Sequence, residues 1–356
     1  MDKRELDKAI EKTVLKMAIE PKNTEHYHQL AKYYAMDNQY EKVISVYESL
    51  LEIDSKDLQT LLNLGSIWFY SKEYKKALKY FNEAVLVNPS NYLVYYNLGN
   101  TYAEMKNFSK ALHYYSRTLD FNSNEPEIYN AIALLYHDFE DYVEARAYYE
   151  KALSIDPNNL SALIDLANVC YKLYDYKQAL EFYYKVLELA PDNETVVLCI
   201  ANTLSVIKDK DECYKYFEKA VELNSDNYKA YICYAIASSD FKDYEKSVDL
   251  YKKAIEISPK EVNAYILLGN LYSNLKKYKE AEEQYREALK INKLDPSIFV
   301  LIANTYYMNN EIERSIYSYR AAINLKPEND EYKLVFIQVL EDFIKDNRKE
   351  DLIANF

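Results

Sequence analysis

The chain has 356 residues, which is enough for two or three domains of ordinary size. It contains only 3 Gly and 8 Pro, whereas a β-sandwich, a β-barrel or an α/β fold of this length needs many more turn residues. The net charge is −13, from 44 basic and 57 acidic residues, so the molecule as a whole repels nucleic acid and anionic lipid surfaces. The composition therefore predicts an acidic, soluble, all-α protein.

The N-terminus and the cysteines indicate the compartment. The chain begins with charged residues and lacks the apolar core of a secretory signal. Its apolar stretches are all interrupted by charges well before the length of roughly 18 residues that a membrane-spanning helix needs. None of the four cysteines has C-x-x-C spacing, so we expect reduced thiols rather than a metal site or a disulfide framework. We therefore expect a cytoplasmic protein without a membrane span.

The first predicted element is a helix over residues 3–20. Leu6, Ile10, Val14 and Met17 form one apolar stripe along it. Residues 1–23 would thus be an N-terminal capping helix, equivalent to half of the repeat that follows.

A sequence repeat organises the rest of the chain. Its period is 34, as between Gly65 and Gly99, and similar segments such as NLGSIWFY, YYNLGNTY, LLGNLYSN and IANTYYMN recur at this spacing without insertion or deletion. Nine repeats are predicted, over residues 24–57, 58–91, 92–125, 126–159, 160–193, 194–227, 228–261, 262–295 and 296–329.

Three positions of the repeat show what packs inside it. Position 8 is always Gly or Ala, position 20 is small in eight repeats and Val43 in the first, and position 24 is always Tyr or Phe. Small residues let two backbones approach closely, and an aromatic ring fills the space beside them. Proline falls only where a helix would begin or end, for example at Pro89 and Pro126. Each repeat is therefore expected to be a pair of antiparallel helices.

The last predicted element is a helix over residues 331–345, within a C-terminal cap and tail of residues 330–356. Its apolar arc is wider than a half-buried helix needs: Leu334, Val335, Phe336, Ile337, Val339, Leu340, Phe343 and Ile344. Two interpretations remain open, which are deep packing against the ninth repeat and a contact surface for a homodimer.

The repeat resembles the tetratricopeptide repeat family. The family pattern W-x2-L-G-x2-Y…A-x3-F…P appears as Leu61, Leu64, Gly65, Trp68, Ala77, Phe81 and Pro89, and again as Tyr129, Ile132, Ala133, Tyr136, Ala145, Tyr149 and Pro157. The resemblance implies a right-handed superhelical solenoid whose first helices line a concave groove. It also implies that positions 2, 5, 9, 12 and 13 of each repeat face that groove.

Two of these groove positions have a composition that suits peptide binding. Position 9 is Asn in five of nine repeats, although Asn is a poor helix former, and an amide can both donate to and accept from a peptide backbone. Position 5 is mostly apolar and could hold apolar side chains of a partner. The alternative is that these Asn bond neighbouring helices and that position 5 is half-buried between repeats. The candidate partner-binding residues are Asn100, Asn168, Asn202, Asn270, Asn304, Leu62, Tyr96, Ile164, Leu198, Ile232, Ile266 and Val300.

Other kinds of site have little support in the sequence. The groove positions carry three basic and five acidic residues, which argues against the basic clamp of some tetratricopeptide co-chaperones and against RNA binding. His26 and His28 are two apart on a helix and cannot share a metal ion. Catalytic, phosphate-binding and zinc motifs are not found. We expect no catalytic residue, no metal and no cofactor.

The sequence thus predicts a non-catalytic scaffold or adaptor that binds a protein or peptide partner in the concave groove, with no nucleic-acid or membrane partner. Two alternatives stay open. One is a structural protein that self-associates through its end caps, and the other is a targeting subunit for a separately encoded enzyme such as a glycosyltransferase.

Overall fold

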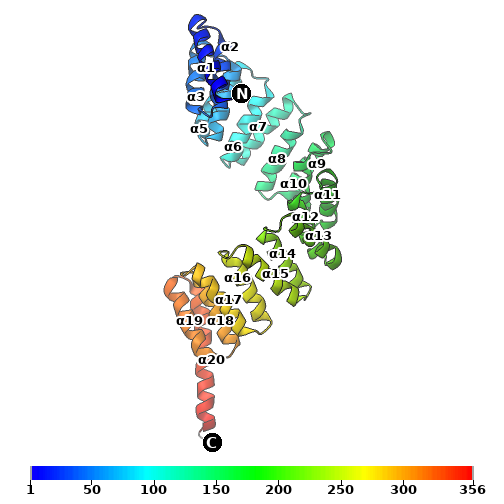
Figure 1. Ribbon diagram of the computed structural model, residues 1–356, viewed down its shortest axis with the longest axis vertical. Helices are drawn as coiled ribbons and strands as arrows, with labels where there is room; N and C mark the ends of the chain where they lie inside the picture. Colours follow the sequence, from blue (N-terminus) through cyan, green and yellow to red (C-terminus); the bar gives the residue numbers. More distant parts are fainter. Residues whose placement is uncertain (1, 355–356) are drawn as a thin grey trace. The chain divides into compact units, whose positions relative to one another are not determined.

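The computed structural model describes residues 2–354, and the side chains of residues 2–345. Within that range it contains 20 α-helices and no strand, so the all-α prediction is confirmed. The chain divides into two compact blocks, an N-terminal block of Met1–Phe182 and a C-terminal block of Tyr183–Phe356. In each block the helices follow one another in chain order as neighbouring pairs (Figure 1).

The N-terminal block contains ten complete helices. They are α1 (Lys3–Ile19), α2 (Thr24–Met36), α3 (Tyr40–Ile53), α4 (Leu58–Tyr70), α5 (Tyr74–Val87), α6 (Tyr92–Glu104), α7 (Phe108–Phe121), α8 (Pro126–Asp138), α9 (Tyr142–Ile155) and α10 (Leu160–Lys172). The boundary between the blocks falls within α11 (Tyr176–Leu189).

The C-terminal block continues with nine further helices. They are α12 (Glu194–Val206), α13 (Lys210–Leu223), α14 (Tyr228–Asp240), α15 (Tyr244–Ile257), α16 (Val262–Asn274), α17 (Tyr278–Ile291), α18 (Pro296–Met308), α19 (Ile312–Leu325) and α20 (Asp330–Ala354).

From α2 to α19, a shorter and a longer helix alternate, with 13 residues in α2 and 14 residues in α3. Equivalent helices begin at a constant interval along the chain, for example at Thr24, Leu58 and Tyr92. We propose that each such pair is one of the repeats marked in the sequence.

The residue directly before each shorter helix, which from α4 on is position 34 of the preceding predicted repeat, is usually a cap. In seven of nine cases this residue is Asn or Asp, and its side-chain oxygen accepts a backbone N–H of the first turn, which would otherwise lack a partner. The seven residues are Asn23, Asp57, Asn91, Asn159, Asn193, Asn227 and Asp295. Pro126 and Pro296 occupy the first helical position of α8 and α18, as expected.

The turn inside each pair uses a conformation that the sequence does not predict. Position 15 has a positive φ, between 56° and 65°, in all nine predicted repeats, yet it is never Gly. In the third repeat, the N–H of Asn107 donates to the carbonyl of Tyr102 at 2.9 Å and that of Lys106 donates to Ala103 at 2.8 Å. These two bonds form a Schellman motif, which ends the helix by satisfying its last carbonyls. The nine residues are Asn38, Lys72, Lys106, Glu140, Tyr174, Lys208, Lys242, Lys276 and Asn310.

Packing inside each pair follows the small and aromatic positions. A Cβ atom added to Gly99 would lie 2.5 Å from Cδ1 of Tyr115, so the ring occupies the space that a side chain would need. The ring at position 24 is almost completely buried in most repeats, for example in Tyr149 and Phe217. The expected role of positions 8 and 24 is therefore confirmed.

The N-terminal helix differs slightly from its predicted stripe. In α1 the buried residues are Leu6 and Thr13, whereas Val14 is 45% exposed. Thr13 can be buried because its hydroxyl donates to the carbonyl of Ala9 at 2.8 Å, which satisfies the polar group within the helix. The buried side of α1 thus contains Leu6, Thr13 and the partly buried Met17.

The C-terminal helix is longer than predicted, and only part of its apolar arc is covered. It spans Asp330–Ala354 rather than residues 331–345. Val339 is buried, and the ring of Phe336 lies 6.4 Å from that of Tyr319. Four other apolar side chains are exposed, namely Leu334, Val335, Ile337 and Ile344. The prediction of deep packing holds for only one side of the helix.

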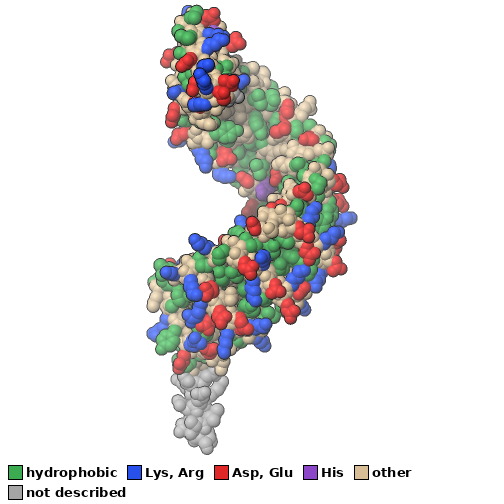
Figure 2. Space-filling model, viewed as in Figure 1, with side chains coloured by type: hydrophobic (Ala, Val, Ile, Leu, Met, Phe, Trp, Pro, Cys, Tyr) green, Lys and Arg blue, Asp and Glu red, His purple; other side chains and the backbone are tan. Residues whose placement is uncertain are grey.

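In the described part of the chain, none of the helices has the combination of length and hydrophobicity that crossing a bilayer requires. Acidic and basic side chains are interspersed over the visible face of each block (Figure 2).

Candidate functional site

The N-terminal block has a pocket of about 440 Å³ formed mainly by the first helices of consecutive repeats. Most of its wall comes from α6 and α8, with contributions from α4 and α10. The walls include many of the positions that the family resemblance implies for a groove, and of the candidate residues they bring together Tyr96 and Asn100. The lining residues are Phe69, Tyr96, Asn100, Ala103, Glu104, Lys106, Tyr115, Glu127, Asn130, Ala131, Leu134, Leu135, Asp138, Asn159, Ser161 and Asp165.

The Asn at position 9 has a structural partner in the same repeat. The hydroxyl of Tyr115 donates to Oδ1 of Asn100 at 2.7 Å, and that of Tyr285 donates to Oδ1 of Asn270 at 2.7 Å. Tyr319 bonds Asn304 in the same way. The alternative interpretation, that these Asn bond a neighbouring helix, is therefore confirmed for three of the five. These contacts use only Oδ1 of each Asn, and the side chain of Asn100 also hydrogen-bonds Tyr96.

The remaining candidate residues lie at several depths. Asn168 and Asn202 are half-buried in α10 and α12, whereas Asn304 is exposed. Of the position 5 residues, Ile232 is buried and packs in the core of the C-terminal block. The other six are half-buried, namely Leu62, Tyr96, Ile164, Leu198, Ile266 and Val300. Position 5 thus lies at the margin between the core and the surface.

The fourth repeat breaks the Tyr–Asn pairing. Its position 9 is Leu134, and the hydroxyl of Tyr149 is buried without a hydrogen-bond partner among the described residues. Burial raises the pKa of this phenol, and the nearby carboxylates of Asp165 and Asp138 raise it further. The unpaired hydroxyl destabilises the folded state, because it loses its hydrogen bonds to water on burial and forms none within the protein.

Charge in the pocket is concentrated and mostly negative. Four carboxylates line it (Glu104, Glu127, Asp138 and Asp165) against one ammonium group, that of Lys106. Lys106 is paired with Asp138 at 3.0 Å. The charges at the groove positions of all nine predicted repeats, counted together from the sequence, do not reveal the excess of carboxylates in this one pocket. The sequence also gave no sign of Asp165, which is at position 6, outside the positions that the resemblance assigns to the groove.

Partial burial affects Asp165 most clearly. Desolvation raises the pKa of this carboxyl above its ordinary value, and the charge of His137 opposes the shift. The hydroxyl of Ser161 donates a long hydrogen bond to it, at 3.5 Å. A desolvated carboxylate with so little compensation is a group that would gain from a cationic ligand.

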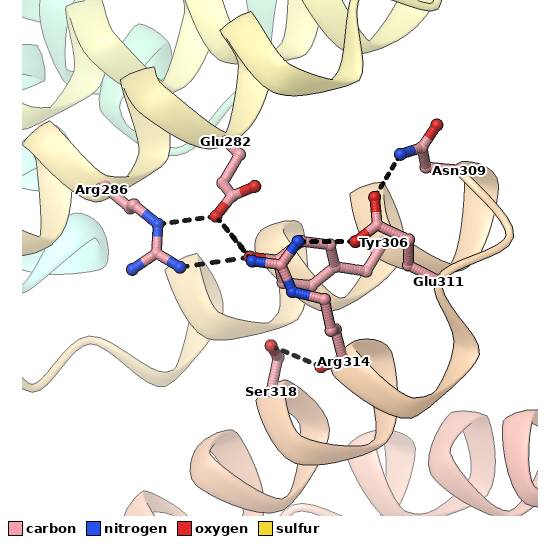
Figure 3. Close-up of polar contacts among 7 residues, drawn as sticks. All are labelled: Glu282, Arg286, Tyr306, Asn309, Glu311, Arg314 and Ser318. Atoms are coloured by element: carbon pink, nitrogen blue, oxygen red, sulfur yellow. Dashed lines mark hydrogen bonds and ion pairs between the residues drawn. The ribbon is translucent and has the colours of Figure 1, made fainter.

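A second polar cluster lies in the C-terminal block, where α17, α18 and α19 meet (Figure 3). Glu282 accepts hydrogen bonds from Nε of Arg286 at 2.8 Å and from the hydroxyl of Tyr306, while Arg314 lies 4.3 Å over the Tyr306 ring. The carboxylate pKa of Glu282 is lowered, because these hydrogen bonds outweigh the effect of burial. Glu311 accepts from Arg314 at 2.6 Å. The charged groups of this cluster pair with one another, and these pairs connect α17, α18 and α19.

The helix pairs, their spacing and their small-to-aromatic packing define a helical-repeat protein. Models described as tetratricopeptide repeat match residues 59–91, 92–158, 124–192, 200–227, 226–293 and 266–330. The chain belongs to the tetratricopeptide repeat family, as the sequence pattern indicated. No curated protein matches the chain.

Solved structures with the same fold are distant in sequence. A tetratricopeptide repeat protein from Parabacteroides merdae has 17% identity and a TM-score of 0.54 over 70% of this chain and 98% of its own. The C-terminal part of a repeat-containing protein from Cytophaga hutchinsonii has 14% identity and a TM-score of 0.52, with 76% and 97% covered. Yeast Tom70 has 17% identity and a TM-score of 0.50, with 97% and 93% covered. These similarities show the fold alone.

Proposed function

We propose that this protein is a non-catalytic, cytoplasmic scaffold that binds a segment of a partner protein on the exposed face of its first helices. The observation that carries the proposal is the pocket on α4, α6, α8 and α10, which has the size of a ligand site and is lined by groove positions of four consecutive repeats. The four cysteines are free thiols, which suits a reducing compartment.

In this proposal the oxygen and the NH₂ group of the candidate Asn side chains have different roles. Oδ1 of Asn100, Asn270 and Asn304 holds a tyrosine hydroxyl, which orients the side chain. In Asn270 and Asn304 the NH₂ group is then the part that a partner backbone can use, whereas the side chain of Asn100 also hydrogen-bonds Tyr96. Replacing these Asn with Ala would remove the acceptor of a buried hydroxyl and would confound binding with stability, so a different test is needed.

A bulky residue inside the pocket gives a cleaner test. Ala103 is half-buried in its wall, and Trp at this position would fill the space that a partner needs. The matched control is Ala147→Trp, on the exposed face of α9. Wild type and both variants are used as baits in native lysate, with mass spectrometry as readout and circular dichroism to check folding.

We expect Ala147→Trp to keep the wild-type partners and Ala103→Trp to lose at least one of them. Partners retained equally by all three folded baits would place binding outside this pocket and refute the proposal.

A second candidate function is self-association through α20. The exposed side chains of Leu334, Val335 and Ile337 favour it, because apolar groups clustered on one helix face gain free energy when covered. Light scattering should then show a dimer that Leu334→Glu converts to a monomer. A monomer at all concentrations for the wild type would eliminate this candidate.

A further inference from the structure

We propose that the pocket on α6, α8 and α10 recognises a Lys or Arg side chain of the bound partner segment. This inference rests on the proposed function and names the chemical class of the partner. Three features of the pocket support it, namely its hydrogen-bonding groups, its aromatic walls and its difference in charge from two pockets of the C-terminal block.

The pocket offers acceptors and few donors. Four carboxylates line it, and its one ammonium group, that of Lys106, is already used by Asp138. The N–H and hydroxyl groups of a neutral or acidic peptide can donate hydrogen bonds to these carboxylates, but they bring no positive charge to balance them. A guanidinium or an ammonium group supplies several donors and a positive charge.

Aromatic rings form another part of the wall. Phe69, Tyr96 and Tyr115 line the pocket, and the rings of Tyr96 and Tyr115 have centroids 6.0 Å apart. A cation over the face of such rings is attracted by their quadrupoles, and the methylene groups of Lys or Arg can pack on the same surface. The combination of rings and carboxylates therefore favours a long basic side chain over a small inorganic cation, which has no apolar part to bury.

Two other pockets lack this imbalance. The pocket at α17–α19 has three acidic and three basic residues in its wall, and the one at α15–α16 has two of each. Their charges can neutralise one another, whereas the pocket on α6, α8 and α10 keeps an excess of carboxylate. The overall charge of the protein does not explain the difference, since all three pockets belong to the same acidic chain.

The half-buried Asp165 also fits a binding role. Desolvation disfavours its charged form, as its raised pKa indicates. The charge of His137 opposes this effect without cancelling it. A bound cation would restore a charge partner in a site where the dielectric constant is lower than in water.

The test begins with a displayed library of random dodecapeptides selected on the immobilised full chain. We expect enrichment of peptides that carry Lys or Arg beside an apolar residue. A fluorescein-labelled copy of the most enriched peptide is then titrated against three folded proteins. These are the wild type, the double variant Glu127→Gln/Asp165→Asn, and the matched control Glu245→Gln/Asp249→Asn, whose two residues lie in the balanced pocket at α15–α16.

The double variant should bind about tenfold or more weakly, because two charge-assisted contacts are lost, and the control should bind like the wild type. Replacing the Lys or Arg of the peptide with Gln should weaken binding to the wild type but not to the double variant. Spermidine, as a free cation without a peptide, should not displace the peptide at equal concentration.

The outcomes separate this inference from the proposed function. Enriched peptides without basic residues, or equal affinity for the double variant, would overturn the inference. If such peptides still fail to bind Ala103→Trp, the proposed function survives. Displacement by spermidine would identify a free polyamine as the occupant and overturn the inference as well. If no peptide is enriched, the inference and the proposed pocket function both fall.

Discussion

The tyrosine at position 24 shows how one hydroxyl can either stabilise or destabilise the same scaffold. In the third and eighth repeats this hydroxyl donates to an Asn across the helix pair. In the fourth repeat the ring of Tyr149 is equally buried, but its hydroxyl has no partner among the described residues because Leu134 replaces the Asn. The ring is therefore required for packing in both cases, whereas the oxygen is useful only where the Asn is present.

This difference predicts opposite effects for the same substitution. Tyr285→Phe should lower the free energy of unfolding by about 1 kcal/mol, because it breaks a buried hydrogen bond. Tyr149→Phe should leave stability unchanged or raise it, since it removes a buried, unpaired hydroxyl. Urea unfolding followed by circular dichroism measures both variants. Equal losses for the two variants would contradict the assignment.

The sequence predicted the aromatic ring at this position but not the purpose of its oxygen. Asn100, Asn270 and Asn304 form a regular series, and a series of amides is equally compatible with ligand binding and with internal bonding. The ambiguity arises because the separation between Asn and Tyr along the chain has no meaning until the turn between the helices places them side by side.

At the scale of helices, the turn inside each repeat contains a residue with a side chain in a backbone conformation that favours Gly. A residue with a side chain adopts the left-handed conformation at a cost of about 1–2 kcal/mol. Lys nevertheless occupies this turn position in five of the nine repeats. These turns could not be foreseen from the sequence, because the usual signal, a Gly after the helix, does not occur.

Lys276→Gly should therefore stabilise the protein by about 0.5–1 kcal/mol, since Gly adopts a positive φ without steric cost. The control is Lys252→Gly within α15, where Gly should destabilise by a similar amount because it weakens a helix interior. Thermal unfolding compares the two variants. A loss of stability for Lys276→Gly would mean that the side chain makes a contact that outweighs the relief of strain.

The cluster around Glu282 joins three helices through paired charges, and its effect should depend on pH. The folded-state pKa of Glu282 is depressed, so its stabilisation is present above the pKa of an unfolded Glu, about 4.3, and is lost as the pH falls through the folded value. Glu282→Gln should cost about 1–3 kcal/mol at neutral pH, and the difference from wild type should fade below about pH 4. The neighbouring Glu283→Gln, on the exposed side of α17, should have little effect at any pH. A pH-independent loss for Glu282→Gln would point to packing instead of charge.

At the scale of the whole molecule, each helix pair inside either block contacts mainly the pairs before and after it. The free energy of unfolding of such an array is close to the sum of the stabilities of the single repeats and of the interfaces between neighbouring repeats. A local defect should therefore remain local, and it should weaken neighbouring repeats before distant ones.

Tyr115→Ala tests this property. Removing the buried ring should cost about 3–5 kcal/mol in its own repeat. Hydrogen exchange should accelerate in α6 and α7 and, to a smaller degree, in the adjoining helices, while α16–α19 exchange as in the wild type. The reciprocal variant Tyr285→Ala should show the reverse pattern. Uniform acceleration across all helices would indicate a single cooperative unit.

The architecture was predictable because it repeats. Gly99 and Tyr115 identify a packing contact once, and eight further copies of the same spacing support it within the sequence itself. The acidic pocket was not predictable in the same way, because Glu104, Glu127 and Asp165 come from three repeats and from different positions within them. Only the stacking of helices brings those carboxylates to one place.

The constant interval between equivalent helices also has an evolutionary consequence. Because equivalent helices from α2 to α19 begin at the same interval throughout, unequal recombination between two repeats in register adds or removes whole helix pairs without breaking a core contact. Such an event within α6–α10 would delete or duplicate the acidic pocket, while the rest of the array keeps its packing. A single recombination event can thus change what this chain binds and leave its fold intact.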